Sequence, residues 1–345
     1  MPGCALPGPE GGSAVAGSEV MVSVLCTAYN HEAYIAQTLD GFLMQETDFD
    51  YEILVNDDAS TDATADIIRD YAARFPERVK AFCQEKNLYS QNINIEDKVL
   101  LPPSRGRYIA FCEGDDHWTD PGKLQRQVDF MEAHPAYSAC VHETLVHYCD
   151  GAVADHLYTK RHHPAGGDRD LDFAETLKGM AHAYHTSALL FRREYAFDLP
   201  DYFYCGASYG FADFPRALFL MQNGPIRFID RPMSLYRARS NPESWSANVD
   251  GRYEKLRRFV YGQIQMLRCF APHVSPEQRP IVDRAILERE FELMYLEGRD
   301  REQRRPPYRA LLREQSLGYR TKNLLKCCLP GLSRRYRKYK GFGDA

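Results

Sequence analysis

The sequence contains no long hydrophobic run. None of its 345 residues belongs to a stretch approaching the roughly 18 uncharged apolar residues that a membrane-spanning helix requires. Residues 1–18 are small and rich in glycine and proline, and they lack the basic start and apolar block of a signal peptide. We expect them to form a disordered leader. These absences predict a soluble protein that stays in the cytosol.

Paired-cysteine motifs and phosphate-binding loops are missing too. The ten cysteines form no C-x-x-C pair, and several lie in apolar runs, such as Cys26 and Cys112. We therefore expect buried free thiols rather than disulfides or a zinc site. No G-x-x-x-x-G-K-[S/T] occurs, and no G-x-G-x-x-G follows the first predicted strand. This disfavours P-loop nucleotidases and dinucleotide-dependent oxidoreductases.

Acidic residues are absent from one segment near the C-terminus. Eight basic residues and no acidic one lie between Arg320 and Lys340, although the net charge of the chain is −5. An acidic body with a basic, partly apolar tail favours contact with an anionic membrane surface. No nucleic-acid-binding motif accompanies the tail, so we expect no nucleic-acid partner. The alternative is a solvated, frayed end.

Strand and helix patterns alternate in the first part of the chain. Buried strands are predicted at 21–29, 51–56, 79–84 and 107–112, with helices at 31–46 and 62–74 between them. Such alternation implies right-handed crossovers and a mostly parallel α/β sheet.

The pattern changes after the fourth strand. A helix at 121–134 is followed by two strands around an Asp150–Gly151 turn and by another strand at 184–192. A helix is then predicted at 209–222, and two short strands at 226–229 and 233–237. Beyond residue 251 the chain is expected to be helical.

Carboxylates follow two of the predicted strands, at the end where ligands bind in a parallel sheet. Glu113, Asp115 and Asp116 follow the fourth strand. Neighbouring carboxylates repel each other, and a divalent cation such as Mg²⁺ or Mn²⁺ would neutralise them. The alternative is that Asp115 or Asp116 caps the next helix, which would explain only one of the three acids.

Other polar residues allow two interpretations each. Asp57 and Asp58, after the second strand, either form a turn or accept a hydrogen bond from a nucleobase N–H. His185 either reaches a diphosphate or acceptor, or is a hydrogen-bonded structural histidine. Arg237 either holds donor phosphates or belongs to a surface pair.

Three segments carry a family resemblance. The runs at 22–45 (VSVLCTAYNHEAYIAQTLDGFLMQ), 51–68 (YEILVNDDASTDATADII) and 106–130 (GRYIAFCEGDDHWTDPGKLQRQVDF) closely resemble glycosyltransferase family 2, which has the GT-A fold. The resemblance continues more loosely through the runs HTSALLFRRE, GFADFPRALFLMQNG and FIDRPMSLYR.

The resemblance implies an α/β GT-A fold with a Rossmann-like, mixed and mostly parallel sheet flanked by helices. The GT-A domain would cover residues 19–245, with a nucleotide-binding half at 19–118 and an acceptor half at 119–245. Residues 246–345 would form a helical C-terminal extension that ends in the basic tail.

The resemblance also assigns residues to the donor site. The loop of Thr27, Ala28 and Tyr29 would line the base and ribose, and Asp58 together with Asp57 would read the base. Asn87, near the end of the third strand, is assigned to the same site.

Metal and catalytic roles follow from the same resemblance. Asp116 would bind the metal and Asp115 would lie near the ribose or the metal. Glu113 stands where the family often has Asp. Asp213, at the start of a helix, matches the position of the general base.

The implied activity is an inverting transfer of a sugar from a UDP-sugar to an acceptor hydroxyl. The cofactor would be Mn²⁺ or Mg²⁺. The acceptor would be a saccharide or a lipid-linked sugar at the inner face of the membrane, in surface polysaccharide or glycolipid synthesis. One alternative is a non-catalytic nucleotide-sugar-binding partner. Another is a metal-dependent nucleotidyltransferase, which should carry a Gly-rich basic loop that the segment TAYNHE lacks.

Overall fold

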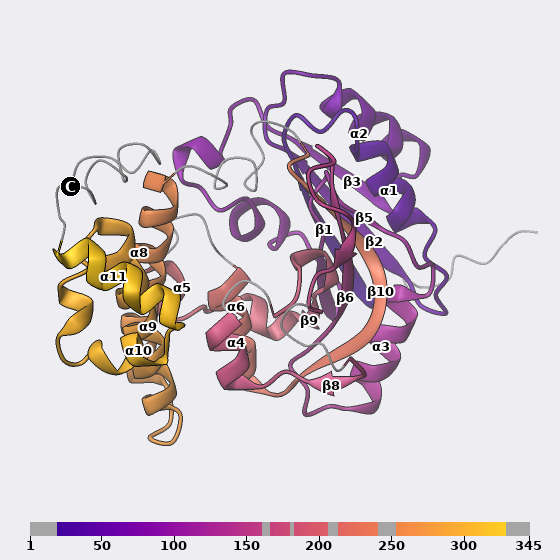
Figure 1. Ribbon diagram of the computed structural model, residues 1–345. Helices are drawn as coiled ribbons and strands as arrows, with labels where there is room; N and C mark the ends of the chain where they lie inside the picture. Colours follow the sequence, from indigo (N-terminus) through magenta and orange to yellow (C-terminus); the bar gives the residue numbers. More distant parts are fainter. Residues whose placement is uncertain (1–18, 161–165, 180–182, 206–212, 241–252, 329–345) are drawn as a thin grey trace, which may run out of the picture.

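A computed structural model describes residues 19–160, 166–179, 183–205, 213–240 and 253–328 (Figure 1). The predicted leader and residues 329–345 of the basic tail lie outside the described residues. One sheet has the strand order β3-β2-β1-β4-β9-β6-β10-β5, with β7 beside β6 and β8 beside β10. Its strands are β1 (Val22–Ala28), β2 (Tyr51–Asp57), β3 (Val79–Cys83), β4 (Tyr108–Phe111), β5 (His117–Trp118), β6 (Ala139–Tyr148), β7 (His156–Leu157), β8 (Arg169–Asp170), β9 (Leu190–Arg192) and β10 (Ile226–Ala238).

The main strands share one direction. β1 pairs in parallel with β2 and β4, and β2 pairs in parallel with β3. β9 is antiparallel to both β4 and β6, so β6 runs in the same direction as β4, and β10 is parallel to β6. The carboxyl ends of β1 to β4, β6 and β10 therefore meet at one edge. The predicted mixed, mostly parallel sheet is confirmed.

Helices cover both faces of the sheet (Figure 1). Successive side chains of a strand point to opposite faces, so Val24 of β1 joins one core while Leu25 joins the other. Figure 1 shows α1, α2 and α3 on one face and α4 and α6 on the other. Their bounds are α1 (Ile35–Leu43), α2 (Thr64–Arg74), α3 (Lys123–Ala133), α4 (Phe173–Gly179) and α6 (Asp213–Asn223).

Three predicted strands differ from the structure. β10 is one strand rather than two, and its pairing with β6 shifts register on either side of Pro232. Proline has no N–H to donate to the ladder, which accounts for an irregularity there. The strand predicted at 184–192 is shorter, because Thr186–Ala188 form a 3₁₀ turn before β9.

A helical region follows the sheet, as the sequence predicts. It comprises α8 (Tyr253–Phe270), α9 (Arg279–Glu297), α10 (Arg309–Glu314) and α11 (Leu317–Cys328). Phe214 and Leu218 of α6 pack with Leu267 and Phe270 of α8, which joins this region to the sheet. Among the described residues, none of the helices combines the length and apolar character needed to span a bilayer.

The cysteines follow the prediction only in part. Cys26, Cys112 and Cys140 are buried free thiols. Cys205, which follows α5 (Asp201–Tyr204), forms a disulfide with Cys269 of α8. The prediction of free thiols is wrong for this pair. The two cysteines are 64 positions apart in the sequence and meet only because α5 packs against α8.

Candidate active site

The loops after β1, β2 and β4 are joined at the carboxyl edge of the sheet. The Gly114 N–H donates to the Thr27 carbonyl (2.9 Å), and the Asp58 N–H donates to the Ala28 carbonyl (2.9 Å). A methyl group on Gly114 would lie only 2.9 Å from the Ala28 Cβ, so glycine permits this close approach. The two acidic segments therefore lie at the same edge, as predicted.

Glu113, Asp116 and His185 form a compact cluster at this edge. One potential ligand atom of each residue lies within 4.8 Å of the others. Asp116 Oδ1 accepts a hydrogen bond from the Arg237 N–H (2.9 Å), and Asp116 Oδ2 lies 3.7 Å from His185 Nδ1. Glu113 Oε2 is buried and has no hydrogen-bond partner in the part of the chain that the structure describes.

The electrostatics of this cluster favour a bound cation. Burial raises the pKa of Glu113 well above its usual range, and the charges of Asp116 and Asp213 raise it further. Burial also raises the pKa of Asp116. Burial lowers the pKa of His185 to about 4, which keeps the imidazole neutral. A divalent cation would relieve the repulsion and give the unpaired oxygen a partner, so these residues fit a metal.

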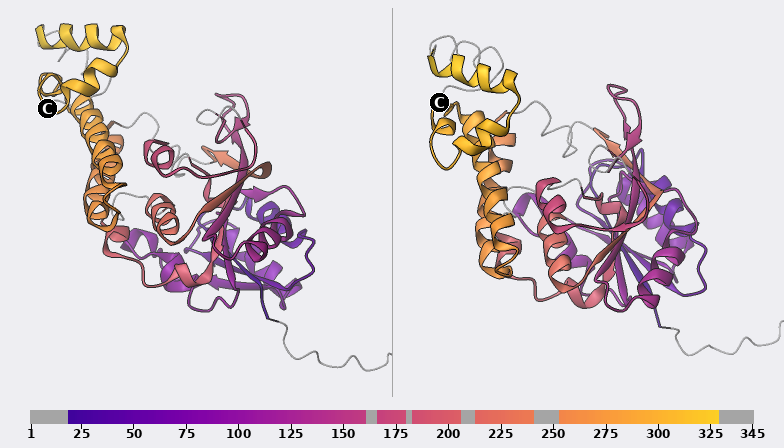
Figure 2. Two further views of the ribbon diagram at one scale, coloured as in Figure 1. Left: turned by 90° about the horizontal axis from the view of Figure 1, so that it is seen from below. Right: turned by 60° about the horizontal axis from the view of Figure 1, so that its bottom comes forward.

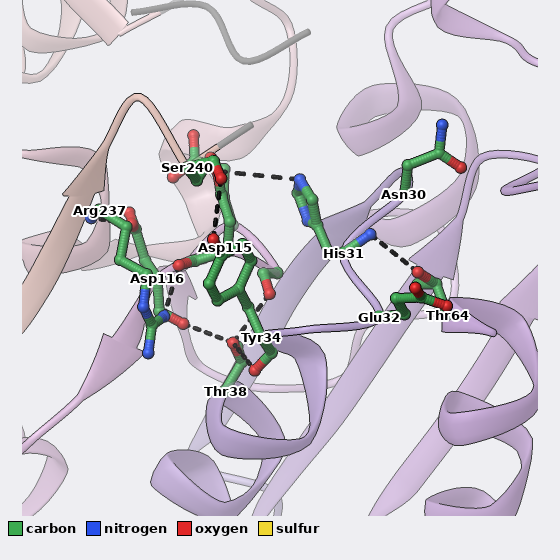
Figure 3. A network of polar contacts seen from close by, with 12 residues as sticks. Asn30, His31, Glu32, Tyr34, Thr38, Thr64, Asp115, Asp116, Arg237 and Ser240 are labelled. Atoms are coloured by element: carbon green, nitrogen blue, oxygen red, sulfur yellow. Dashed lines mark hydrogen bonds and ion pairs between the residues drawn. The ribbon is translucent and has the colours of Figure 1, made fainter. Parts of the chain in front are cut away.

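Asp115 lies in a network of polar contacts that Figure 3 shows together with Asp116. Its carboxylate accepts a hydrogen bond from Ser240 Oγ (2.6 Å) and lies 3.8 Å from His31 Nε2. The Tyr34 hydroxyl donates to the Ser240 carbonyl (2.8 Å). The residues after β10 are thereby tied to the acidic loop. Sequence reasoning missed Tyr34, His31 and Ser240, which carry no motif of their own.

The capping alternative for the acidic loop is wrong. Asp116 bonds to Arg237, and Asp115 bonds to Ser240. Asp120 is the carboxylate near the start of α3, where it accepts a hydrogen bond from the Gly122 N–H (2.9 Å). Neither Asp115 nor Asp116 is therefore needed to begin the helix.

Arg237 is buried, with only 7% of its surface exposed, so the surface-pair alternative is wrong. Its guanidinium donates to the Asp115 carbonyl and to Gln37, and it lies over the Tyr34 ring at 4.9 Å. Figure 3 shows it beside Asp115 and Asp116. These contacts hold the acidic loop in place. They do not test whether Arg237 binds the donor phosphates, so that role stays a prediction.

The two acids at the end of β2, Asp57 and Asp58, differ in whether their carboxylate oxygens already accept hydrogen bonds. Asp58 Oδ1 and Oδ2 accept from the N–H groups of Leu88 (2.7 Å) and Tyr89 (3.1 Å). Asp57 Oδ2 accepts from the Ser60 N–H (3.2 Å), which is the expected turn. Asp57 Oδ1 is buried and, within the described ranges, has no partner. The oxygen still able to accept a base N–H therefore belongs to Asp57.

The other donor residues border the same loops. Thr27 and Tyr29 are half-buried at the end of β1, and Ala28 between them is buried. Asn30, the next residue, has a positive φ of 54° and accepts from the Thr61 N–H (2.9 Å). The Asn87 side chain donates to the Asp58 carbonyl (3.1 Å) and so stabilises the loop after β2.

Asp213 is the first residue of α6 and lies beside the cluster. Burial raises its pKa, whereas a hydrogen bond from the Thr186 side chain and the nearby Arg216 charge lower it. Asp213 is nevertheless an exposed residue. Thr186, which donates this hydrogen bond, directly follows His185 of the cluster in the sequence. The acid expected to act as base is thus close to the acids expected to hold the metal.

Aromatic residues enclose His185, and sequence reasoning missed their arrangement. The Tyr236 ring stacks on the imidazole at 4.2 Å, and the Tyr158 ring meets it edge-on at 5.4 Å. Burial raises the pKa of Tyr158, and the charges of Asp213 and Glu113 add to this rise. Through its ring contact with His185, Tyr158 borders the cluster. Tyr236 belongs to β10 and Tyr158 follows β7, so no local pattern predicts the contact.

Comparison with known families identifies the class of protein. Residues 23–196 match the family "Glycosyl transferase family 2". Because this match covers half of the chain, the chain belongs to glycosyl transferase family 2. The resemblance found in the sequence runs is confirmed.

Two relatives illustrate the extent of the similarity. Uncharacterized protein Rv1520 of Mycobacterium tuberculosis is 38% identical over 177 residues, which cover 51% of this chain and 48% of that protein. WfaP of Escherichia coli, a UDP-Glc:alpha-D-GlcNAc-diphosphoundecaprenol beta-1,3-glucosyltransferase, is 34% identical over 117 residues. These cover 34% of this chain and 43% of WfaP. The chain thus spans about half the length, or less, of the curated relatives it matches.

A solved structure shares the fold. The mannosyltransferase PcManGT from Pyrobaculum calidifontis, in complex with GDP-Man and Mn²⁺, aligns with a TM-score of 0.50 and 17% identity. The alignment covers 94% of this chain and 87% of PcManGT. At this identity the comparison supports the predicted GT-A-like fold and nothing finer.

Proposed function

We propose that this chain moves a sugar from a nucleotide-sugar donor, a UDP-sugar, to an acceptor hydroxyl. The observation that carries the proposal is the Glu113–Asp116–His185 cluster, together with Asp213, which accepts a hydrogen bond from Thr186, the residue after His185. One group of side chains is suited to a metal and a diphosphate, and the neighbouring acid is suited to accept a proton. Membership of glycosyl transferase family 2 supports the same reaction.

The donor would lie along the loops after β1 and β2. Thr27, Ala28 and Tyr29 would line its base and ribose. Asp57 would accept a hydrogen bond from the base through its Oδ1, which has no partner among the residues that the structure describes, while Asp58 would hold the neighbouring loop in place. The UDP-Glc donor in the name of WfaP favours a UDP-sugar.

Glu113, Asp116 and His185 would hold the cofactor, with Asp115 as a further candidate ligand. Carboxylate oxygens suit Mg²⁺ or Mn²⁺, and the PcManGT structure contains Mn²⁺. When bound, such a cation would offset the charge that develops on the leaving diphosphate. The buried Arg237 would keep Asp116 oriented through its main-chain N–H.

The residues of the chain then account for the remaining steps. Asp213 would take the proton from the acceptor hydroxyl as that oxygen forms a bond to the anomeric carbon. The bond between that carbon and the diphosphate oxygen would break in the same displacement. The donor and acceptor oxygens lie on opposite faces of the carbon, so the configuration inverts. No covalent intermediate with the enzyme is required.

The acceptor would be a lipid-linked saccharide in surface polysaccharide or glycolipid synthesis, used at the inner face of the membrane. The name of WfaP specifies a diphosphoundecaprenol-linked acceptor. The basic segment between Arg320 and Lys340 supports contact with an anionic membrane.

A nucleotide-sugar panel tests the proposal. UDP-, GDP- and dTDP-sugars would be incubated with the protein and Mn²⁺ or Mg²⁺, and release of the nucleoside diphosphate would be measured. Asp213→Asn should abolish turnover yet retain binding of UDP with Mn²⁺. Asp129→Asn, at an exposed acid of α3, serves as the control and should behave as the unmodified protein. Binding of UDP without any turnover of the unmodified protein would favour the non-catalytic binding partner.

A further inference from the structure

The outward face of α11 presents an apolar stripe. Leu317, Leu324 and Leu325 are 75%, 46% and 55% exposed. Their spacing of seven and eight residues places them on one side of a helix. Hydrophobic side chains of this size are normally scattered singly over a surface, whereas a cluster marks an interaction site.

The opposite face of α11 is fixed to the protein. Asn323 is buried and donates to Gln303 Oε1 (2.7 Å) and to the Asp300 carbonyl (3.2 Å). Lys326 pairs with the Asp300 carboxylate at 3.2 Å. These contacts set the rotation of the helix about its axis. The leucines therefore face outward because the polar side chains of the same helix are the ones that the protein buries.

Positive charge flanks the stripe. Arg320 and Lys322 are exposed on α11, and no acidic residue follows in the sequence until Asp344. The segment from 329 to 340 adds five more basic residues. Apolar side chains bordered by cations complement an anionic lipid surface, in which the leucines enter the acyl boundary and the cations meet the headgroups.

The helix α11 lies apart from the sheet. Figure 2 shows α11, in yellow, at one end of the helical region and away from the sheet. Its outward face is therefore placed where an outside surface can reach it.

We propose that α11 docks on an anionic lipid bilayer through Leu317, Leu324 and Leu325, with Arg320 and Lys322 at the headgroups. Docking itself does not depend on the reaction proposed above. The benefit of docking, access to a lipid-linked acceptor, rests on that proposed function.

Co-sedimentation of the full chain with vesicles tests the docking. The chain should bind phosphatidylcholine vesicles that contain phosphatidylglycerol and should not bind pure phosphatidylcholine. Leu324→Gln/Leu325→Gln should lower the partition coefficient by about tenfold for each leucine. Arg320→Gln/Lys322→Gln should lower it by about fivefold for each cation.

A matched control and a second measurement complete the test. Met44→Gln/Phe75→Gln changes two side chains that are each 37% exposed outside α11 and should leave vesicle binding unchanged. Unaltered binding of the double leucine variant overturns the proposal. So does a leucine-dependent dimer, seen by ultracentrifugation, in a chain that binds no vesicles. Nucleotide-sugar hydrolysis without lipid should be equal in all variants, so its absence would count against the proposed function and not against docking.

Discussion

Replacing Glu113 by glutamine should have opposite effects on stability with and without metal. Glu113 Oε2 has no hydrogen-bond partner among the described residues, and burial together with Asp116 and Asp213 raises its pKa. At neutral pH the Glu113 carboxyl must therefore either keep a proton that it would lose in water or ionise beside other negative charges. Either state costs folding free energy. Glutamine removes that cost. It also removes a ligand that a cation would use.

The magnitude follows from the geometry of the cluster. Its ligand atoms lie within 4.8 Å of one another, and two unit charges at that distance repel by about 3.5 kcal/mol at an effective dielectric constant of about 20. Protonation relieves part of this repulsion, so we expect glutamine to stabilise the metal-free protein by about 2 kcal/mol at about pH 7.5. Because the pKa of Glu113 is higher in the folded than in the unfolded state, its destabilising effect grows as pH rises above the ordinary pKa. The advantage of glutamine should shrink toward acidic pH.

Thermal unfolding in EDTA and in Mn²⁺ with UDP measures both effects. In EDTA the variant should melt higher by about 4 °C, at about 2 °C per kcal/mol for a chain of this size. A ligand at a hundred times its Kd adds about 2.7 kcal/mol, so in Mn²⁺ with UDP the unmodified protein should melt higher than the variant.

Glu52→Gln provides the matched control for this comparison. Burial favours protonation of Glu52, but hydrogen bonds from Lys80, Ser23 and Arg105 outweigh it and lower its pKa. This variant should lose about 2 kcal/mol in both conditions, because it removes the charge that strengthens the hydrogen bonds from Lys80, Ser23 and Arg105. If Glu113→Gln also lowered the melting temperature in EDTA, Glu113 would be held by contacts within the protein, and the metal interpretation would fail.

Three further predictions concern other parts of the chain. Asp57→Asn should weaken UDP binding about tenfold in calorimetry, because it removes a charge-assisted hydrogen bond; unchanged affinity would refute base recognition by this residue. Arg216→Met should cost about 3 kcal/mol in urea unfolding, since Arg216 pairs with Glu96 at 3.4 Å and the variant leaves that acid without its cation; an equally stable variant would contradict this. Reduction of the Cys205–Cys269 disulfide should lower the unfolding free energy by about 4 kcal/mol, because it opens a loop spanning 64 positions; Cys205→Ser should show the same loss and no response to reductant.

The strand ends could be predicted from the sequence because the signals are local. Buried runs such as Tyr51–Asp57 mark strands, and the carboxylates after them must lie at the carboxyl edge once the strands are parallel. The placement of Asp213 at a helix start came instead from the family resemblance, because the local pattern predicts a helix over 209–222. The family resemblance then supplied the order of these motifs along the chain.

Contacts between distant segments could not be predicted in this way. The stacking of Tyr236 on His185 depends on how β10 lies beside the turn before β9. The Cys205–Cys269 bond depends on the packing of α5 against α8. The fusion of two predicted strands into β10 depends on its partner β6, which continues the ladder past Pro232. In each case tertiary contacts decide the outcome, and the local sequence carries no record of the partner.

The contrast between Glu52 and Glu113 shows how structure separates two kinds of buried acid. Glu52 lies within β2, and Glu113 follows β4. The partners of Glu52 outnumber its oxygens, so its charge is stabilised by the fold itself. Glu113 is half-buried, and its buried Oε2 lacks a partner among the described residues while acidic side chains lie nearby, a state that folding alone does not favour. A bound species that supplied the missing partner would stabilise this state, which is why the unpaired acid is the stronger indicator of function.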